Sequence, residues 1–406
     1  MKACVFTLGC KMNEVESMSL AAGLEERGYE VTDVLCEADL YLINTCAVTK
    51  EAEKKSRQAV ARVRKFNPLA PVAVFGCAAS NDPESFYEKE GVIFVSGAQG
   101  KNKVLSLLGE RGIFPDSNER VFSELPAPKR LKTRAFVRVQ DGCDRFCSYC
   151  LIPYLRGRSR SRKAVSVLKE ASAATAKEIV LTGIDISSYR DGETDLGGLL
   201  DSLKGLPVRV RLGSLEPQII TGKFLDRAKG ADNVMPHFHL SLQSGSDRVL
   251  KSMNRHYTRK EYLEKCALIY EYFPNAAITT DMIVGFSGET EEDFQDSVSI
   301  IGEAGLARVH VFPYSPREGT TAFKKADTPA EIKKDRTARL LSAADEAERK
   351  FLEKQIGTVV KVLFEEDGGY SENYVRVYAE GAKEGELKKV KVTSAVEHGV
   401  FGNAID

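Results

Sequence analysis

The sequence lacks several features that would restrict the class of protein. No stretch approaches the roughly 20 consecutive apolar residues that a membrane-spanning helix needs, so we expect no membrane partner. The first ten residues, MKACVFTLGC, alternate as a strand does, whereas a signal peptide would have a basic head and an apolar middle. The chain also contains no internal repeat and no tract of low complexity. These absences predict a cytoplasmic protein built of ordinary globular domains.

The chain has no net charge, since 58 Lys and Arg balance 58 Asp and Glu. The charges are nevertheless unevenly distributed. Residues 126–163 carry eleven Lys and Arg against only Asp141 and Asp144. A local basic excess is typical of contact with a polyanion, and it is equally compatible with a solvated basic face.

Histidine is scarce, with five residues, whereas cysteine is plentiful, with nine in a chain of 406. An intracellular compartment keeps thiols reduced, so nine cysteines indicate metal binding or redox chemistry rather than a disulfide scaffold. The length allows two or three cores at roughly 100 to 200 residues per domain.

The N-terminal third alternates short apolar runs with helical patterns. The runs are residues 2–8, 39–44 and 71–75, and the helical patterns are residues 14–27 and 50–65. Strands that alternate with helices are typical of βαβ units and a parallel sheet. Residues 123–134 carry two prolines and four basic residues without periodicity, which indicates a linker. A first domain is therefore predicted over residues 1–125.

Six further strand patterns follow, namely FVRVQ, EIVLTG, VRVRLGS, HFHLSLQ, AITTDMIVG and ARVHVFPYS. Six βα units in series indicate a partial (βα)6 barrel, with site residues just after the strands. A long amphipathic helix over residues 328–353 ends this second domain, which is predicted to span 126–354. Residues 355–406 alternate at period two between Gly-containing turns and predict a small β-barrel. The predicted fold class is thus α/β, with a parallel-sheet domain, a partial barrel and a small β-barrel.

Three cysteines form the pattern C-x3-C-x2-C in VQDGCDRFCSYCLIP, directly after a predicted strand; they are Cys143, Cys147 and Cys150. Three thiolates on one short loop suit an iron–sulfur cluster and leave one iron of a four-iron cluster open. A structural zinc site would need four ligands, and none of the five histidines lies within eighty residues. A thiol–disulfide motif would need only C-x2-C and would leave Cys143 unexplained.

Three other cysteines each follow a predicted parallel strand, in TLGC, INTC and FGC; they are Cys10, Cys46 and Cys77. The ends of parallel strands share one edge of a sheet, so these three loops should meet and form a second three-ligand site. Any one of them alone would more often be an ordinary buried thiol. We expect ordinary thiols at the remaining positions, Cys4, Cys36 and Cys266.

C-x3-C-x2-C after the first strand of a barrel is the mark of the radical S-adenosylmethionine (SAM) superfamily, which the sequence resembles. Within it, the chain resembles the methylthiotransferases over nearly its whole length. The N-terminal cysteines stand in TLGCKMN, LINTCAVT and FGCAA, and the likeness continues in LSLQSGSDRVLKSMNRHY, DMIVGFSGETEEDF and VFPYSPREGT. The segments GCKMN, NTCAVT and VQDGC are most similar to the bacterial enzymes that act on N6-threonylcarbamoyladenosine in tRNA.

This resemblance implies two 4Fe-4S clusters and SAM as cofactors. The cluster whose free iron binds SAM would be held by Cys143, Cys147 and Cys150. The deoxyadenosyl radical released there would take a hydrogen atom from an adenine ring carbon, while a second SAM would supply the methyl group. A second cluster, which carries or donates the sulfur, would be held by Cys10, Cys46 and Cys77. The implied partners are the anticodon stem-loop of tRNA and an electron donor protein.

Other cofactor contacts are implied at Tyr149, Ser214, Glu216, Gln243 and Gly285. Tyr149 stands where the superfamily keeps an aromatic residue near the SAM adenine, and the missing side chain of Gly285 would suit a wall of the adenine pocket. The polar residues follow barrel strands. For each of these the alternative is a strand-end or turn residue with only a packing role.

Four arginines follow Cys150 at two-residue spacing, at positions 156, 158, 160 and 162. An extended segment would point them to one side, where phosphates could bind, whereas a helix would spread them around its axis. The family likeness favours cofactor or sulfur-path contacts at Arg156 and Arg158.

The C-terminal barrel resembles the TRAM domain, a module that helps such enzymes hold tRNA, although this copy has mixed charge. Sister activities share the chemistry and differ in the substrate pocket; they act on isopentenyl-adenosine in tRNA or on a ribosomal-protein aspartate. A non-catalytic RNA-binding protein with structural zinc is the alternative from another class.

Overall fold

The computed structural model describes residues 1–116, 120–128 and 133–405. Its N-terminal part is a six-stranded sheet in the order β2-β1-β3-β4-β5-β6, in which every pairing is parallel. The elements are β1 (Lys2–Thr7), α1 (Lys11–Glu25), β2 (Glu30–Thr32), β3 (Leu40–Thr45), α2 (Lys50–Val63), β4 (Val72–Gly76), α3 (Cys77–Asn81), α4 (Pro83–Tyr87), β5 (Val92–Ser96), η1 (Lys101–Lys103) and β6 (Gly112–Phe114).

Helices cover both faces of this sheet, and each face has its own core. Alternate residues of β1 point to opposite sides, so Val5 packs with Leu20 and Leu24 of α1, while Cys4 packs with Val60 of α2. α1 begins three residues before the predicted helix, at Lys11, because its N-terminal cap is Cys10. The short strands β2, β5 and β6 were not predicted from the sequence.

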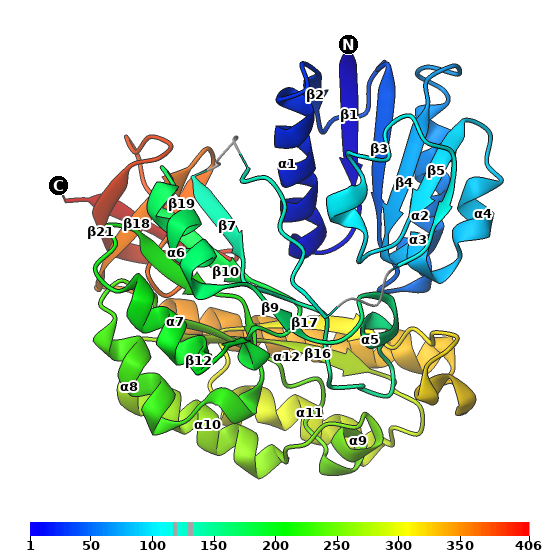
Figure 1. The fold of residues 1–406 in the computed structure, drawn as a ribbon. Helices are drawn as coiled ribbons and strands as arrows, with labels where there is room; N and C mark the ends of the chain where they lie inside the picture. Colours follow the sequence, from blue (N-terminus) through cyan, green and yellow to red (C-terminus); the bar gives the residue numbers. More distant parts are fainter. Residues whose placement is uncertain (117–119, 129–132, 406) are drawn as a thin grey trace.

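The central part is a curved wall of six parallel strands with helices on its outer side (Figure 1). Its elements are β7 (Arg134–Arg138), β8 (Gln140–Asp141), α5 (Ile152–Leu155), β9 (Arg160–Ser161), α6 (Ala164–Ala173), β10 (Glu178–Thr182), η2 (Ile186–Ser188), β11 (Arg190–Asp191), β12 (Thr194–Asp195), α7 (Leu196–Leu203), β13 (Arg209–Leu212), β14 (Ser214–Leu215), η3 (Pro217–Ile219), α8 (Gly222–Gly230), β15 (His237–Leu240), α9 (Asp247–Ser252), α10 (Arg259–Tyr272), β16 (Ala277–Val284), α11 (Glu291–Glu303), β17 (Arg308–Pro313), η4 (Thr321–Lys324) and α12 (Ala330–Glu353).

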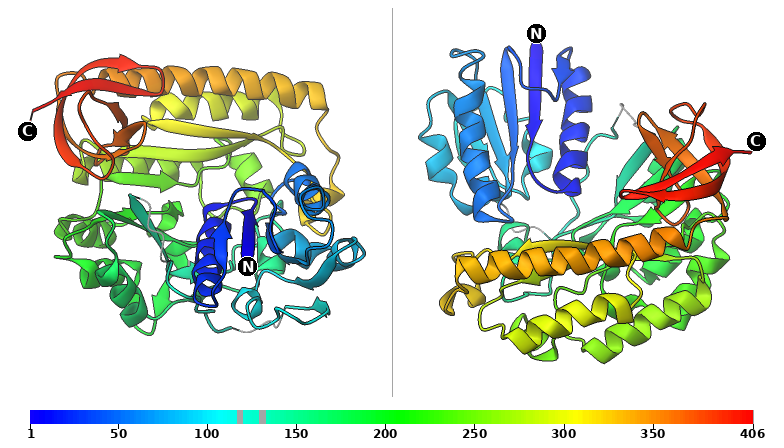
Figure 2. Two further views of the ribbon diagram at one scale, coloured as in Figure 1. Left: turned by 90° about the horizontal axis from the view of Figure 1, so that it is seen from above. Right: turned by 180° about the vertical axis from the view of Figure 1, so that it is seen from behind.

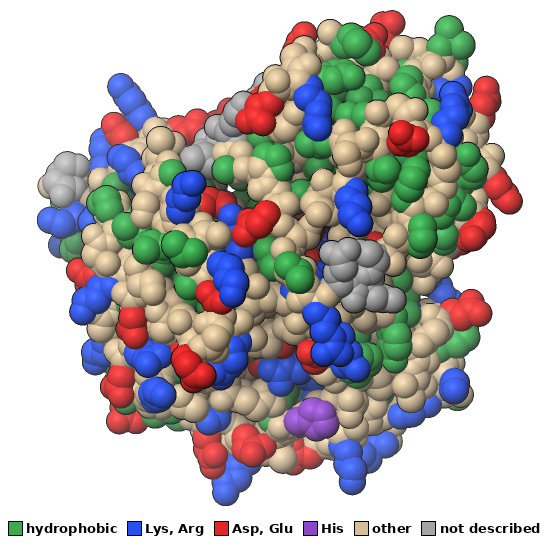
Figure 3. Space-filling model, in the orientation of Figure 1, with side chains coloured by type: hydrophobic (Ala, Val, Ile, Leu, Met, Phe, Trp, Pro, Cys, Tyr) green, Lys and Arg blue, Asp and Glu red, His purple; other side chains and the backbone are tan. Residues whose placement is uncertain are grey.

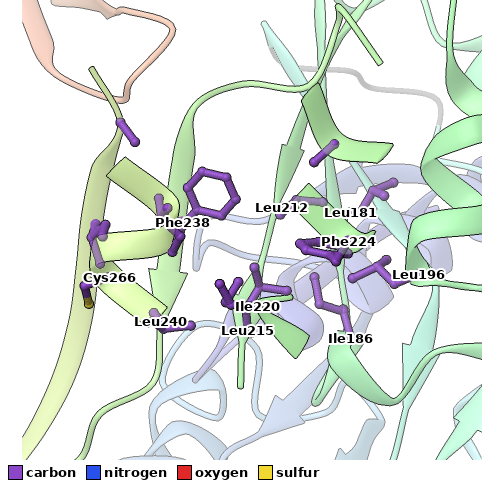
Figure 4. Close-up of a cluster of buried hydrophobic side chains, with 14 of the residues drawn as sticks. Leu181, Ile186, Leu196, Leu212, Leu215, Ile220, Phe224, Phe238, Leu240 and Cys266 are labelled. Carbon is purple, nitrogen blue, oxygen red and sulfur yellow. The ribbon is translucent and has the colours of Figure 1, made fainter. Parts of the chain in front are cut away.

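The wall consists of two sheets, β13-β10-β7 and β14-β15-β16-β17. β13 and β14 are two parts of one extended segment, interrupted only at Gly213, and count as one of the six strands. The edge strands β7 and β17 therefore bound an open side, so the predicted partial barrel is confirmed. Its largest core lies between the strands and the outer helices (Figure 4). Cys266 belongs to this core, as expected for an ordinary thiol.

The C-terminal part is a closed barrel with the strand order β18-β19-β20-β22-β21, which confirms the predicted small β-barrel. Its strands are β18 (Val359–Glu365), β19 (Gly368–Tyr370), β20 (Arg376–Tyr378), β21 (Leu387–Val396) and β22 (Gly399–Ala404). Tyr374 stacks on His237 of the central wall, with ring centroids 4.5 Å apart. Arg211 of β13 donates to the carbonyl of Glu372, so the small barrel is joined to the central wall.

The three parts succeed one another along the chain and can be followed by colour in Figure 2. On the face drawn in Figure 3, basic and acidic side chains are interspersed, in keeping with the zero net charge. Among the described helices, none has the length and apolar character needed to cross a membrane.

Candidate functional site

The three N-terminal cysteines meet at one edge of the N-terminal sheet. Cys10 follows β1, Cys46 follows β3 and Cys77 begins α3 directly after β4. These three strands are neighbours in the sheet and run in the same direction, so their ends lie side by side. Cys10 is exposed, whereas Cys46 and Cys77 are buried. One of the three thiols therefore faces outward from the sheet edge.

Two glycines allow the cysteine loops to approach one another. Gly9 has φ +105°, and a side-chain Cβ there would lie 2.7 Å from the Cβ of Cys46. Gly76 has φ +104°, and a Cβ there would lie 2.7 Å from the carbonyl oxygen of Thr45. Both backbone conformations are accessible to glycine at little cost. The residue before Cys10 and the residue before Cys77 thus have to be glycine for the loops to pack as they do.

Polar side chains hold these loops in place. Asn13 donates to the carbonyl of Leu8 at 2.8 Å and to the carbonyl of Thr45 at 3.0 Å, so it links the loop of Cys10 to the loop of Cys46. The Ser56 hydroxyl accepts from the backbone N–H of Cys46 at 3.0 Å. The cysteine positions are therefore defined by hydrogen bonds within the chain.

The other triplet lies on the loop between β8 and α5. Phe146, between the first two cysteines, has a left-handed backbone with φ 49°. The backbone N–H of Arg145 points at the Sγ of Cys143 at 3.4 Å. Ser148 donates from its hydroxyl to the carbonyl of Ser252 at 2.8 Å. The loop is thus anchored to the end of α9.

Burial raises the pKa of several of these thiols. Desolvation raises the pKa of Cys46 to about 11, and it raises the pKa of Cys143 and of Cys150 to about 12. The pKa of Cys77 is also raised, because burial outweighs the opposing positive charge of Arg156. A metal ligand must be the thiolate, so binding of a metal group here would release protons.

The segment that follows Cys150 packs against the segment that begins at Cys77. α5 begins two residues after Cys150 and packs against α3, whose first residue is Cys77. Leu151 and Leu155 lie in the same apolar cluster as Cys77. The segment that follows one trio therefore packs against the segment that carries part of the other.

A buried arginine strengthens this link. Arg156 has no exposed surface and donates to Glu16 at 3.0 Å, to Asn13 at 2.9 Å and to Asp141 at 2.8 Å. Burial alone would raise the pKa of Asp141, yet the charges of Arg156 and Arg160 hold it at about 2. Arg156 thus connects the N-terminal helix α1 to β8, the strand that leads into the loop of Cys143, Cys147 and Cys150.

The other arginines of the run are also occupied by carboxylates. Arg158 pairs with Asp144 at 3.1 Å, Arg160 pairs with Asp141 at 2.9 Å, and Arg162 pairs with Glu124 at 2.9 Å. Cofactor or sulfur-path contacts at Arg156 and Arg158 stay a prediction. The segment is neither one strand nor one helix, since only Arg160–Ser161 is extended in a ladder, and each arginine is directed by its own acidic partner.

Of the predicted cofactor residues, Tyr149 stands on the loop of Cys147 and Cys150, whereas Ser214 begins β14 and Gln243 follows β15. Tyr149 packs edge-to-face against Phe286, with centroids 6.3 Å apart. Ser214 is exposed on β14. Gln243 has a left-handed φ of 69°, and its backbone N–H donates to the carbonyl of Asp281 at 2.9 Å. A strained non-glycine residue at a strand end is typical of functional sites.

Gly285 lies in the turn between β16 and α11, and its role at an adenine pocket stays a prediction. A Cβ at this position would lie 2.5 Å from the Cγ of Lys333 on α12, and φ is +67°. The space left by the missing side chain is therefore taken by α12. The backbone N–H of Gly285 donates to the carboxylate of Glu289 at 2.7 Å, which fixes the turn after β16.

One residue that contacts Cys147 was not predicted from the sequence. Arg255 donates to the Sγ of Cys147 at 3.3 Å and to the carboxylate of Glu216 at 2.5 Å. It lies in the segment MNRHY, but 108 residues separate it from Cys147. Only the folding of α9 against the cysteine loop brings the two together. Glu216 therefore acts on the triplet through Arg255.

Among residues 1–116, 120–128 and 133–405, no group of three His, Cys, Asp or Glu side chains is arranged to hold a single metal ion. A structural zinc ion needs such a compact set of ligands, commonly four in a tetrahedron.

A cysteine triplet after the first strand of an open six-stranded βα wall defines a radical SAM protein. In agreement, residues 137–301 match the family described as "Radical SAM superfamily", and residues 2–97 match "Uncharacterized protein family UPF0004". The threonylcarbamoyladenosine tRNA methylthiotransferase MtaB of Bacillus subtilis (strain 168) is 35% identical over 96% of this chain and 93% of its own length. The chain therefore belongs to the methylthiotransferase family of radical SAM enzymes and is a transferase.

Two further relatives show the range of this family. The MtaB of Aquifex aeolicus (strain VF5) is 37% identical over 97% of this chain and 100% of its own length. The tRNA-2-methylthio-N(6)-dimethylallyladenosine synthase of Oceanobacillus iheyensis is 33% identical over 97% of this chain and 82% of its own length. Relatives with different named substrates thus cover nearly the same residues.

A solved structure shares the fold. The radical SAM methyltransferase TsrM from Kitasatospora setae, with cobalamin and a [4Fe-4S] cluster bound, has a TM-score of 0.62 and covers 86% of this chain and 91% of its own. Its sequence identity is 14%, so the likeness concerns the fold alone.

Proposed function

We propose that this enzyme adds a methylthio group to C2 of N6-threonylcarbamoyladenosine, next to the anticodon of tRNA. The observation that carries the proposal is the packing of α5, just after Cys150, against α3, which begins at Cys77, together with the buried ion pair of Arg156 with Glu16 of α1. A reaction that joins sulfur to a carbon radical needs a radical source and a sulfur source in one cavity. The names of the Bacillus and Aquifex relatives support the choice of nucleoside.

The donor sets fit the cofactors of the family, which are SAM and iron–sulfur clusters. Each trio offers three thiols and leaves one iron of a four-iron cluster without a protein ligand. When bound, these groups supply the carbon radical, the sulfur and the methyl group. The cluster that binds SAM is assigned to Cys143, Cys147 and Cys150. The second cluster is assigned to Cys10, Cys46 and Cys77.

The chain's own residues orient these groups. Arg255 places an N–H donor on the Sγ of Cys147 while Glu216 fixes its guanidinium. A hydrogen bond to a thiolate ligand stabilises its charge and tunes the metal group. We propose Tyr149 on this loop, Ser214 on β14 and Gln243 after β15 as contacts of SAM. Burial of Cys46 and Cys77 keeps water away from this side of the site.

We assign residues 1–125 to the sulfur-carrying domain, residues 126–354 to the radical SAM domain and residues 355–406 to a TRAM-like barrel. The anticodon stem-loop is proposed as the RNA partner, and an electron donor protein is proposed to reduce the first cluster. The reaction is placed in the cytoplasm, where tRNA is found.

Mass spectrometry of tRNA nucleosides from cells that lack the gene tests the substrate. The methylthio-threonylcarbamoyl nucleoside should disappear and return when the gene is restored. Unchanged levels would contradict the assignment. Loss of a methylthio-isopentenyl nucleoside would identify the sister activity instead.

Alanine variants test the two trios in purified enzyme. Loss of Cys147 should abolish production of deoxyadenosine from SAM, whereas loss of Cys46 should spare this cleavage and stop sulfur insertion. Cys266→Ala is the matched control, because this buried thiol lies in the core between strands and helices. Thiolated product from the Cys46 variant would contradict the second site.

A further inference from the structure

A row of polar side chains lines the inner face of the central wall. Along β15, β16 and β17, the alternate residues Phe238, Met282 and Val309 pack into the core beneath the outer helices. Because side chains alternate along a strand, the residues between them face the concave side. The row consists of Ser214, His239, Thr279, Asp281 and His310. Apart from Ser214, the row has no assigned part in the proposed chemistry.

Hydrogen bonds connect part of this row. The Nε2 of His237 and the Nδ1 of His239 each lie 3.0 Å from the hydroxyl of Thr279, and the Nε2 of His239 lies 3.4 Å from the Oδ2 of Asp281. A Thr hydroxyl has one proton to donate. If the Nε2–H of His239 faces the carboxylate, Nδ1 accepts from Thr279, which in turn accepts from His237. This order of hydrogen bonds orients the carboxylate of Asp281.

Asp281 and His310 are the accessible members of the row. The Asp281 side chain is 34% exposed, and His310 is exposed on the edge strand β17. The two residues are direct partners in the ladder between β16 and β17. The ring of His310 lies 6.1 Å from that of His239. An acceptor and a ring N–H donor therefore stand side by side and open to the barrel.

The row also has space and position. A cavity of about 270 Å³ lies between β17 and α12, which runs along this strand (Figure 2). Of the row, His310 alone lines it, together with Arg308 and with Glu348 of α12, whose carboxylate lies 3.8 Å from the Nε of Arg308. The backbone of Asp281 accepts from Gln243, one of the proposed SAM contacts, at 2.9 Å. The row thus leads from the proposed SAM site to the open edge of the barrel.

The charge state of His310 suits hydrogen bonding. Burial lowers its pKa below the ordinary value, although the charge of Asp281 acts in the opposite direction. The ring is therefore neutral near pH 7 and presents one N–H donor. Arg308 on the same strand adds a permanent positive charge, and its side chain is 48% exposed.

The substrate candidates differ in the group that this row would meet. A threonylcarbamoyl group carries N–H donors, a hydroxyl and a carboxylate, whereas an isopentenyl group is a hydrocarbon. A site with polar groups strongly rejects a ligand that cannot pair them. We propose that His310 and Asp281 read the N6 substituent of the adenosine, with His310 and Arg308 facing its carboxylate and Asp281 accepting its N–H. This inference rests on the proposed function and names its specificity residues.

Binding of two anticodon stem-loop RNAs tests the role of His310. One RNA carries N6-threonylcarbamoyladenosine and the other carries plain adenosine at the same position. His310→Phe keeps an aromatic ring and removes the donor. We expect it to weaken binding of the modified RNA by about 10- to 100-fold, the range for a hydrogen bond to a charged group, and to leave the plain RNA unaffected. His310→Gln keeps an N–H donor and should restore part of the difference.

The outcomes separate the inference from the proposed function. If the wild-type enzyme neither prefers nor modifies the threonylcarbamoyl RNA, the proposed function fails regardless of His310. If the wild type discriminates and His310→Phe keeps the same ratio, the specificity role is refuted. Equal weakening for both RNAs would also refute it, because His310 would then contact common parts of the RNA. SAM cleavage without RNA should be unchanged, and its loss would assign His310 to the cofactor instead.

Discussion

Arg156 is the group whose replacement should most clearly separate the two halves of the site. Its two terminal nitrogens donate to Glu16, Asn13 and Asp141, and no part of the side chain is exposed. Arg156→Gln is shorter and uncharged, so both carboxylates would lose a buried cation. Breaking a buried ion pair by removal of one partner costs about 3–5 kcal/mol.

The expected cost lies at the lower end of this range. Glu16 keeps its ion pair with Lys101, and Asp141 keeps Arg160 at 2.9 Å. Neither carboxylate is left without a cation, so we expect a loss of about 3 kcal/mol in the free energy of opening this contact. Because the protein has several domains, a single unfolding free energy is poorly defined.

Native-state hydrogen exchange measures this loss by segment. Protection should fall in α1 and around α5 and stay unchanged in the C-terminal barrel. Arg211→Gln is the matched control: Arg211 is 2% exposed and pairs with Glu178 at 2.8 Å beside the C-terminal barrel. It should reduce protection there and spare α1. A loss below 1 kcal/mol in α1, or the same pattern from both variants, would refute the reasoning.

Three further predictions concern the cysteine loops and the ion pairs. Gly76→Ala should lower the stability of the N-terminal domain by about 1–3 kcal/mol, because alanine is strained at this positive φ and its Cβ would approach Thr45. It should also lower the iron content of that domain, and full iron occupancy would argue against this prediction. Arg255→Lys keeps the charge but loses the planar fork, so deoxyadenosine production should fall by at least about 10-fold, and an unchanged rate would exclude a role at Cys147. The pKa of Asp141 is about 2 instead of 3.8, so above pH 4 this group adds about 2 kcal/mol to the stability of the folded state. That contribution is lost as the pH falls toward 2. Asp141→Asn should flatten this part of the pH dependence of hydrogen exchange, and an unaltered slope would contradict the prediction.

The sequence by itself determined the elements of this protein and the chemistry of its cysteines. Period-two and period-3.6 patterns depend on neighbours within a few residues, so the six strands of the central wall, the helix before the C-terminal barrel and that barrel were predicted correctly. The triplet from Cys143 to Cys150 is local as well. The meeting of Cys10, Cys46 and Cys77 followed from one topological rule, that parallel strand ends share an edge.

Only the tertiary structure decided the partners of the charged residues. Arg156 meets Glu16 across 140 positions, and Arg255 meets Cys147 across 108. Arginine is long and flexible, so its spacing in the sequence does not determine its direction, whereas a buried guanidinium must find a carboxylate. The two-residue spacing of the arginine run therefore left two arrangements open, and the surroundings of Gly285 depend on α12, which lies 45 or more residues further along the chain. Long-range packing selects such contacts, because the energy of a buried charge is set by which elements surround it.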